Sequence, residues 1–273
     1  MRLYFRAHCI CGFEAMKSGA SEEPQFAAWL AALEARHLTD LRVPEVTRAL
    51  RALSSAYVER RHRVAHGAAL ESTGKRAAFA LFYAPLHFIT IQHVLRALGA
   101  EVPPLTSILD IGCGTGAAGA AWALAADDSP KVYGIDRHPW AVEETRWTYR
   151  HFHLRGQARQ GDVAHLPSLR TGSAAVAAYI LNELSDTSRR RVEDALLAAA
   201  GRGARVLVLE PIARAVVPWW DASAKRIEAA GGRADEWRFL ADLPPLLQLL
   251  DKAAGLNHRE LKVRSLYCPG VAG

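Results

Sequence analysis

The chain has 273 residues, half of them hydrophobic, and a formal net charge of +6. Such a length buries a sizeable core, and an ordinary charged content without low-complexity tracts excludes an intrinsically disordered protein. We find no uninterrupted apolar run of the ~20 residues that a membrane-spanning helix needs, and no signal-peptide core, so we expect a soluble cytoplasmic protein with no membrane partner.

The N-terminal region reads differently from the helix-rich sequence that follows it. Residues 1–20 are a candidate disordered extension, and Met16 is a candidate alternative start. The cysteines are too few and too dispersed for a disulfide framework or for a zinc site with paired CxxC arms, so we predict no metal. They are Cys9, Cys11, Cys113 and Cys268.

The first part of the chain carries helical patterns and no strand signal, and we assign residues 1–101 to an N-terminal helical unit. Helices are predicted to begin at Pro24 and Pro44, because proline suits the first turn and apolar residues follow at helical spacing. A third helix is predicted over residues 77–98, before a glycine that suits its C-terminal cap. We expect Pro85 to kink this helix or to divide it in two.

Short apolar runs then alternate with helical segments, a pattern typical of a parallel α/β sheet. We therefore assign residues 102–273 to a second domain with a Rossmann-like sheet. The number of strands, six or seven, stays open, because only one strand's worth of sequence follows the last predicted helix. The predicted strands are 107–111, 131–135, 157–160, 174–181, 204–209 and 259–268. The predicted helices are 116–126, 139–152, 187–200, 218–230 and 243–254.

The strongest local signal follows the first predicted strand, where an acidic residue precedes three alternating glycines. Glycine lets a ligand lie against the backbone, and the amides at the start of the next helix can donate to a polar or anionic group. Gly112, Gly114 and Ala117 also satisfy the dinucleotide fingerprint, with Asp136 at the expected distance. A dinucleotide site, however, requires neither Asp110 nor the third glycine.

Polar residues follow three further predicted strands in the order that a nucleoside-containing cofactor needs. Asp136 is suited to bind ribose hydroxyls, and Asp162 or the neighbouring amide is suited to bind an adenine amine. The cofactor-binding candidates are Asp110, Gly112, Cys113, Gly114, Gly116, Asp136, Arg137, Asp162, Val163 and Leu181. The catalytic candidates are Asn182 and Glu183, since open α/β sheets place reactive groups at the carboxyl ends of strands.

Each candidate also has a purely structural interpretation. Asp110 is able to cap the glycine loop, and Asp136 to cap the helix that begins at Pro139. Asn182 is equally compatible with a turn at the end of a strand, and Glu183 with a surface charge. These alternatives stay open on the sequence alone.

The acceptor side of the site is predicted to come from the N-terminal helices. They connect to the first strand by a short linker at Pro103-Pro104, so we expect them to pack over the carboxyl edge of the sheet. Basic residues between positions 48 and 76 are suited to phosphate contacts, or else form a solvated helix face. The substrate-binding candidates are Tyr83, His87, Arg60, Arg61 and Arg63.

With its Asp110–Gly116 motif, the chain resembles class I S-adenosylmethionine (SAM)-dependent methyltransferases over about residues 104–268. A narrower resemblance is to the methyltransferase-like family associated with the small ribosomal subunit. Four segments carry it: Leu53–Tyr57, residues 77–85, Tyr179–Leu184 and Val208–Pro211. This chain departs from that family in having threonine between two of its glycines. It also lacks the family's cysteine cluster, so the metal centre is not carried over.

The resemblance implies a SAM-dependent methyltransferase that binds SAM and S-adenosylhomocysteine and acts on ribosomal RNA or the small ribosomal subunit. The acceptor-side residue Asn182 cannot act as a base but can orient an amide or an amine, which favours an N- or C-methyl acceptor. Two alternatives remain. One is a SAM-binding ribosome assembly factor without turnover, and the other is a small-molecule N- or O-methyltransferase.

Overall fold

The computed structural model describes residues 24–59, 70–100, 104–126 and 129–270. The expected extension over residues 1–20 and the basic candidates Arg60, Arg61 and Arg63 lie outside the described residues.

One seven-stranded sheet organises the fold, with the strand order β3-β2-β1-β4-β5-β7-β6. The first five strands are parallel, and the last two form an antiparallel pair whose member β7 joins β5. The α/β, Rossmann-like class is therefore confirmed, and the carboxyl ends of β1 to β5 meet at one edge. The strands are β1 (Ser107–Ile111), β2 (Lys131–Asp136), β3 (Gly156–Gln160), β4 (Ser173–Ala178), β5 (Arg205–Glu210), β6 (Arg233–Leu240) and β7 (Glu260–Cys268).

Two strands differ from the sequence predictions. The open question of six or seven strands is answered by β6, an edge strand whose alternating charged residues hid it from the apolar pattern. The fourth strand ends at Ala178 and not at Leu181, because residues Leu181–Glu183 turn away in one 3₁₀ turn, η4. This early end sets the position of both catalytic candidates.

The described helices agree in place with the predicted ones. In the N-terminal part they are α1 (Pro24–His37), α2 (Val43–Glu59), α3 (Thr73–Ala78), the π-helical turn η3 (Phe79–Tyr83) and α4 (Ala84–Leu98). Among the strands they are α5 (Ala117–Ala125), α6 (Pro139–His151), α7 (Asp186–Gly201), α8 (Trp220–Ala229) and α9 (Pro245–Ala254).

The predicted interruption near Pro85 is the π-helical turn η3. Pro85 itself lies in the first turn of α4, directly after η3, and because the helix is continuous its missing N–H leaves one hydrogen bond of the helix unmade there. The helix ends at Gly99, whose φ of 59° gives the left-handed cap that the sequence predicted. The π turn widens the helix directly before α4 and directs the side chains of Phe79 and Tyr83.

The continuous helical stretch Thr73–Leu98 is, contrary to the sequence expectation, long and apolar enough by composition to span a membrane. However, 78% of its most apolar window is buried inside the protein. Its hydrophobicity is therefore that of a core helix.

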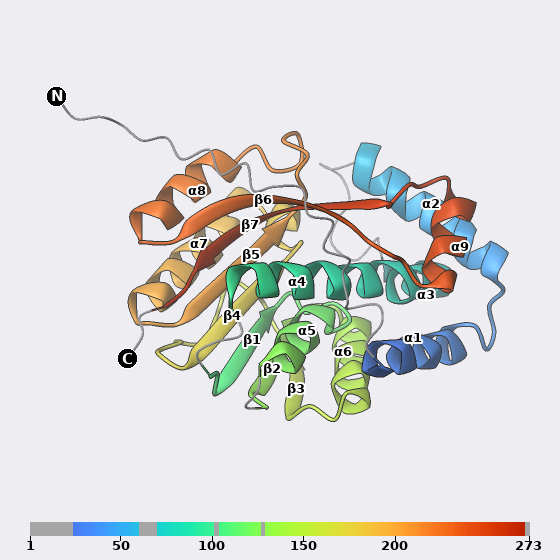
Figure 1. The fold of residues 1–273 in the computed structure, drawn as a ribbon, viewed down its shortest axis with the longest axis horizontal. Helices are drawn as coiled ribbons and strands as arrows, with labels where there is room; N and C mark the ends of the chain where they lie inside the picture. Colours follow the sequence, from blue (N-terminus) through green and yellow to red (C-terminus); the bar gives the residue numbers. More distant parts are fainter. Residues whose placement is uncertain (1–23, 60–69, 101–103, 127–128, 271–273) are drawn as a thin grey trace.

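Helices cover the two faces of the sheet unequally. Figure 1 shows α4 crossing the sheet beside α5 and α6. The buried residues of these helices form one core cluster with side chains of β1, β2, β4, β5 and β7 that point to the same face. The other face packs against α7 and α8, with buried residues of β4, β5 and β7. Residues 161–172, which connect β3 to β4, form no helix. The helices of the N-terminal part thus share a core with the sheet, whereas the domain boundary at residue 101 stays a prediction.

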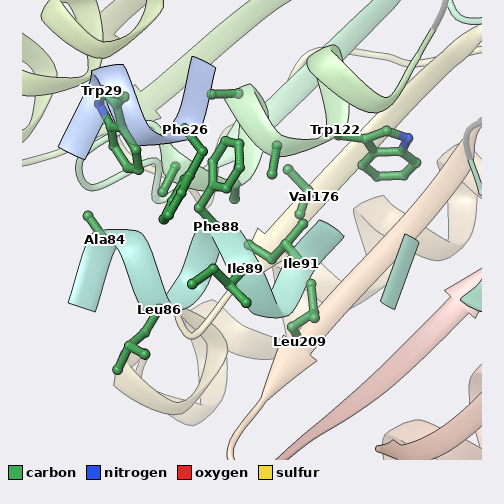
Figure 2. Packing of buried hydrophobic residues seen from close by; sticks show 14 of the residues in the cluster. Phe26, Trp29, Ala84, Leu86, Phe88, Ile89, Ile91, Trp122, Val176 and Leu209 are labelled. Atoms are coloured by element: carbon green, nitrogen blue, oxygen red, sulfur yellow. The ribbon is translucent and has the colours of Figure 1, made fainter. Parts of the chain in front are cut away.

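Aromatic side chains join α1 to α4 and to the end of α6, and Figure 2 shows those of Phe26, Trp29 and Phe88. The Phe88 ring of α4 lies 5.1 Å from the Phe26 ring and 5.5 Å from the Trp29 ring, measured between centroids. On its other side the Phe152 ring lies 5.6 Å away. All four side chains are buried, so Phe88 contributes both apolar burial and ring contacts.

A buried acid adds a polar connection to the same interface. The Glu144 carboxylate on α6 is fully buried, and it accepts a hydrogen bond from Arg36 Nε at 3.2 Å. His37 Nε2 lies 2.8 Å from the same carboxylate. Because removing one partner would leave a buried charge uncompensated, this cluster fixes α1 on α6.

We predict that Phe88→Ala lowers the free energy of unfolding by about 3–5 kcal/mol, the usual cost of removing a buried aromatic ring. Leu249→Ala is the matched control, because Leu249 is 52% exposed, and its cost should stay within about 0.5 kcal/mol. Urea denaturation followed by circular dichroism measures both. Equal losses in the two variants would contradict a shared core.

Candidate functional site

The glycine loop between β1 and α5 lies at the carboxyl edge of the sheet. Gly112, Gly114 and Gly116 have φ values of 64°, 54° and 79°, a conformation that residues with side chains rarely adopt. A Cβ on Gly112 would lie 2.5 Å from the Ile180 side chain, which follows β4. Glycine is therefore required at this position for two independent reasons.

Asp110 supports this loop from beneath. Its carboxylate is 1% exposed and accepts hydrogen bonds from Gly119 N at 2.9 Å and Tyr149 Oη at 3.0 Å. Burial raises the pKa of Asp110 to about 7, although both hydrogen bonds act in the opposite direction. Of the two interpretations left open, the structure favours a support for the loop over a direct ligand contact.

Asp136 ends β2 beside the loop. One carboxylate oxygen accepts from Gly114 N at 3.0 Å, and the other accepts from His138 N at 2.8 Å. The N-cap of α6 is His138, whose ring accepts from Trp140 N, so the interpretation of Asp136 as that cap is wrong. The half-buried carboxylate keeps lone pairs for a ligand, and burial raises its pKa.

The other cofactor candidates divide by exposure. Arg137 and Asp162 are exposed at the mouth of the site, where Asp162 Oδ1 accepts from Ala164 N at 2.9 Å. The side chains of Cys113, Val163 and Leu181 are buried, so only their backbone atoms can face a ligand. Within the described part of the chain there is no group of three or more metal-ligating side chains.

The turn after β4 brings both catalytic candidates to the edge. Tyr179 takes a φ of 59°, an uncommon conformation for a residue with a side chain, and the chain then turns through η4. Asn182 is half-buried, whereas Glu183 is exposed at the mouth. Partial enclosure raises the pKa of Glu183, the Asp136 charge adds to this, and Arg137 opposes it.

A fully buried acid, Glu210 at the end of β5, holds this turn. Its carboxylate accepts from Leu181 N at 2.8 Å, from Asn182 N at 3.2 Å and from Asn182 Nδ2. Burial raises the pKa of Glu210 to about 8. The sequence indicated a Glu-Pro pair here but not its role, because the contact joins residues 28 positions apart.

Four rings from η3, α4 and the β4 turn form an aromatic wall beside the glycine loop: Phe79, Tyr83, His87 and Tyr179. The His87 and Tyr179 rings stack at 4.1 Å, and Tyr83 lies 6.0 Å from Phe79 and 6.2 Å from His87. The Phe79 ring approaches Gly114 closely, at 3.5 Å from where a Cβ would stand. The sequence predicted Tyr83 and His87 but missed Phe79, which only the π turn brings to the loop.

Burial makes the polar groups of this wall poor proton carriers. It lowers the pKa of His87 to about 3 and raises that of Tyr83 to about 12. Both groups are therefore neutral at physiological pH, and the wall offers flat, uncharged surfaces.

A hollow of about 350 Å³ lies elsewhere, on the sheet face that the β3–β4 connection leaves without a helix. Leu109, Tyr133, Ile135 and Leu169 line it. Strand side chains alternate between faces, and this face is opposite to the one covered by α5 and α6. It holds none of the predicted catalytic residues, so we place the functional site at the glycine loop.

Comparison with protein families adds a decisive observation. Residues 108–203 match the model of a methyltransferase domain family. The matched segment, about a third of the chain, contains the glycine loop, Asp136 and the turn after β4. Over these residues the chain is similar to methyltransferase domains, which supports a SAM-dependent methyltransferase. Comparison with curated proteins finds no significant match.

Solved structures of this methyltransferase fold are remote relatives in sequence. A SAM-dependent methyltransferase from Aquifex aeolicus is 16% identical, with 67% of this chain and 91% of that chain covered and a TM-score of 0.47. The N-methyltransferase NodS from Bradyrhizobium japonicum, in complex with S-adenosylhomocysteine, is 15% identical over 67% and 88%, at 0.46. A putative RNA methyltransferase from Pyrococcus horikoshii is 15% identical over 69% and 86%, at 0.46.

The residues at the methyltransferase site fit SAM. The three glycines leave the backbone of Gly112–Gly116 without side chains. At Gly114 the Phe79 ring is the nearest side chain to the space that a ligand would enter. The half-buried Asp136 carboxylate, which already accepts from Gly114 N, is suited to bind the two ribose hydroxyls. The amides of Gly112, Cys113, Gly114 and Gly116 already donate hydrogen bonds within the protein, so the glycines would serve SAM by letting it lie close against the backbone.

We predict that Asp136→Ala weakens SAM binding by about 1–3 kcal/mol, because the ribose hydroxyls lose a charged acceptor. Asp162→Ala, a change of the same kind at the exposed mouth, should cost less if Asp136 is the ribose ligand. Isothermal titration calorimetry measures both, and circular dichroism checks the fold. Unchanged SAM affinity in a folded Asp136→Ala variant would contradict the assignment.

Gly112→Ala should also reduce SAM affinity, by about tenfold or more, because the new methyl group collides with Ile180 and distorts the loop. Gly255→Ala is the matched control: its φ of 74° carries the same backbone strain of about 1 kcal/mol, but a Cβ there meets nothing within 4 Å. The control should lose stability and keep its SAM affinity. Equal SAM affinities in the two variants would show that the Ile180 contact is unimportant.

Proposed function

We propose that this methyltransferase modifies the RNA of the small ribosomal subunit. The observation that carries the proposal is the aromatic wall beside the glycine loop. Each of its four rings keeps part of its surface exposed, and flat uncharged rings suit an unstacked RNA base. The resemblance of the flanking segments to the ribosome-associated family supports the same acceptor.

Cations on α2, on α3 and directly after β2 suit the phosphates that accompany such a base. Arg48 and Arg51 are exposed on α2, and the Arg76 guanidinium lies 5.9 Å from the Trp140 ring. Arg76 and Arg137 both lower the pKa of His138, which places them on the same side of the site. With the net charge of +6, these residues favour an anionic partner.

Methyl transfer depends more on the position of the acceptor than on proton transfer. SAM, when bound, supplies a methyl carbon that is already activated for transfer. The protein's part is to hold the acceptor in line with that carbon and to exclude water, which the wall and the turn after β4 are placed to do. Asn182 orients the acceptor, and Glu183 lies at the mouth of the site, where water can receive the proton.

Two alternatives lead to different outcomes in one experiment. The protein is incubated with tritiated-methyl SAM and small ribosomal subunits from cells that lack its gene, with subunits from unmodified cells as control. Under our proposal, only the first preparation gains label, and the label stays in the RNA. A non-catalytic assembly factor binds subunits without transfer, and a small-molecule enzyme does neither. Either of these results would contradict the proposal.

We predict that charge reversal at Arg60, Arg61 and Arg63 weakens RNA binding and flattens its salt dependence. The slope of log K against log salt should fall by about 2–3, close to one for each lost phosphate contact. Reversal of the exposed Arg190 and Arg191 on α7 is the control and should leave the slope unchanged. Fluorescence anisotropy with labelled RNA fragments measures both. Identical slopes would remove these three arginines from the interface.

A further inference from the structure

We propose that Glu210 fixes the side-chain amide of Asn182 with its carbonyl oxygen toward the methyl acceptor, and that the acceptor atom is therefore an amine nitrogen that carries hydrogen. This inference rests on the proposed methyl transfer at this site. It adds a positioning residue and the chemical class of the acceptor.

The first step concerns the direction of the Asn182 amide. Glu210 Oε1 accepts from the backbone N–H groups of Leu181 and Asn182, at 2.8 Å and 3.2 Å, and Oε2 accepts from Asn182 Nδ2. An ionised carboxylate only accepts hydrogen bonds, so it must face the amide nitrogen and not the amide oxygen. Glu210 has no exposed surface and cannot move aside without breaking all three bonds.

The second step concerns the atom that is left. None of the described residues donates a hydrogen bond to Asn182 Oδ1, and the Asn182 side chain is half-exposed. Ile180, two residues earlier, packs against the bare α-carbon of Gly112. The amide oxygen is therefore a fixed hydrogen-bond acceptor beside the glycine loop, in a turn that Glu210 holds.

The third step concerns the acceptor. A carbonyl oxygen binds a group that donates a hydrogen, which disfavours ring carbons and ring nitrogens that have only a lone pair. A neutral amine attacks through its lone pair before it loses a proton: the N–C bond forms as the S–C bond breaks, sulfur keeps that electron pair, and the nitrogen releases its proton to water. A hydroxyl must lose its proton early, to a base that an amide cannot replace. An exocyclic amino group fits best.

Ionisation of Glu210 should control this arrangement. Burial raises the pKa of Glu210 to about 8 against its three hydrogen bonds, and the Glu183 charge adds to the rise. The Tyr179 hydroxyl is a further polar group close to it, whereas Arg264, its partner in register on β7, directs its guanidinium to Glu236 and the Trp220 ring. Below that pKa the protonated Glu210 carboxyl can donate a hydrogen bond, so the Asn182 amide is free to turn its oxygen toward Glu210. Methyl transfer should therefore rise between about pH 7 and pH 9.

Glu210→Gln tests the direction of the amide. Glutamine keeps an oxygen for the two backbone N–H groups but presents a donor to Asn182, which reverses the amide. We expect kcat to fall by about tenfold or more, without the rise toward pH 9 and with SAM affinity unchanged within about twofold. The double variant Asn182→Asp/Glu210→Gln restores an oxygen toward the acceptor, so its kcat should recover by about tenfold relative to Glu210→Gln. The single variant Asn182→Asp places a second carboxylate against that of Glu210, so its kcat should stay low.

The assay uses tritiated-methyl SAM and small ribosomal subunits that lack the modification, with thermal melting as a check on folding. Wild-type kcat in Glu210→Gln, a double variant no better than Glu210→Gln, or a methyl group found on oxygen or carbon would each overturn the inference. Failure of the proposed function gives a different result, namely no labelled subunits with any variant. In that case the side-chain NMR signals of Asn182 test the inference. Their chemical shifts should change with pH around pH 8 in the wild type and should not change in Glu210→Gln. Signals that do not titrate overturn the inference.

Discussion

The site depends on one buried carboxylate, that of Asp110, at the end of β1. Through Gly119 N and Tyr149 Oη it joins the start of α5 to α6, and the glycine loop is held between these two helices. Without cationic partners, this acid is stable in the core only because its hydrogen bonds replace water. The left-handed glycines can then keep a conformation that leaves the backbone open to a cofactor.

The acceptor side is built in an analogous way on a second buried carboxylate. Glu210 holds the turn after β4, Ile180 in that turn touches Gly112, and Phe79 of the π turn closes the other side of the loop. Two acids, on the strands β1 and β5 that flank β4, thus fix two loops against each other. The N-terminal helices complete the site, because α4 shares a core with the sheet and places the His87 ring against the Tyr179 ring.

Most of the sheet could be predicted from the sequence, because β1 and β2 are apolar runs that end in glycine or acid. β6 could not, since its charged residues give an edge strand no apolar signal. At the site, Asp136 was predicted because a strand-ending acid has a local signature. Glu210 and Phe79 were not assigned roles: one acts across the pairing of β4 with β5, and the other depends on a π turn. Both positions come from tertiary contacts.

The central claim is that the glycine loop and Asp136 form a SAM site and not a dinucleotide site, although the sequence pattern is compatible with both. Competitive isothermal titration calorimetry tests it most directly, with S-adenosylhomocysteine and NAD titrated separately and then against each other. The account predicts that S-adenosylhomocysteine binds at one site per chain and that NAD neither binds there nor displaces it. Tighter binding of NAD, with displacement of S-adenosylhomocysteine, would contradict the account.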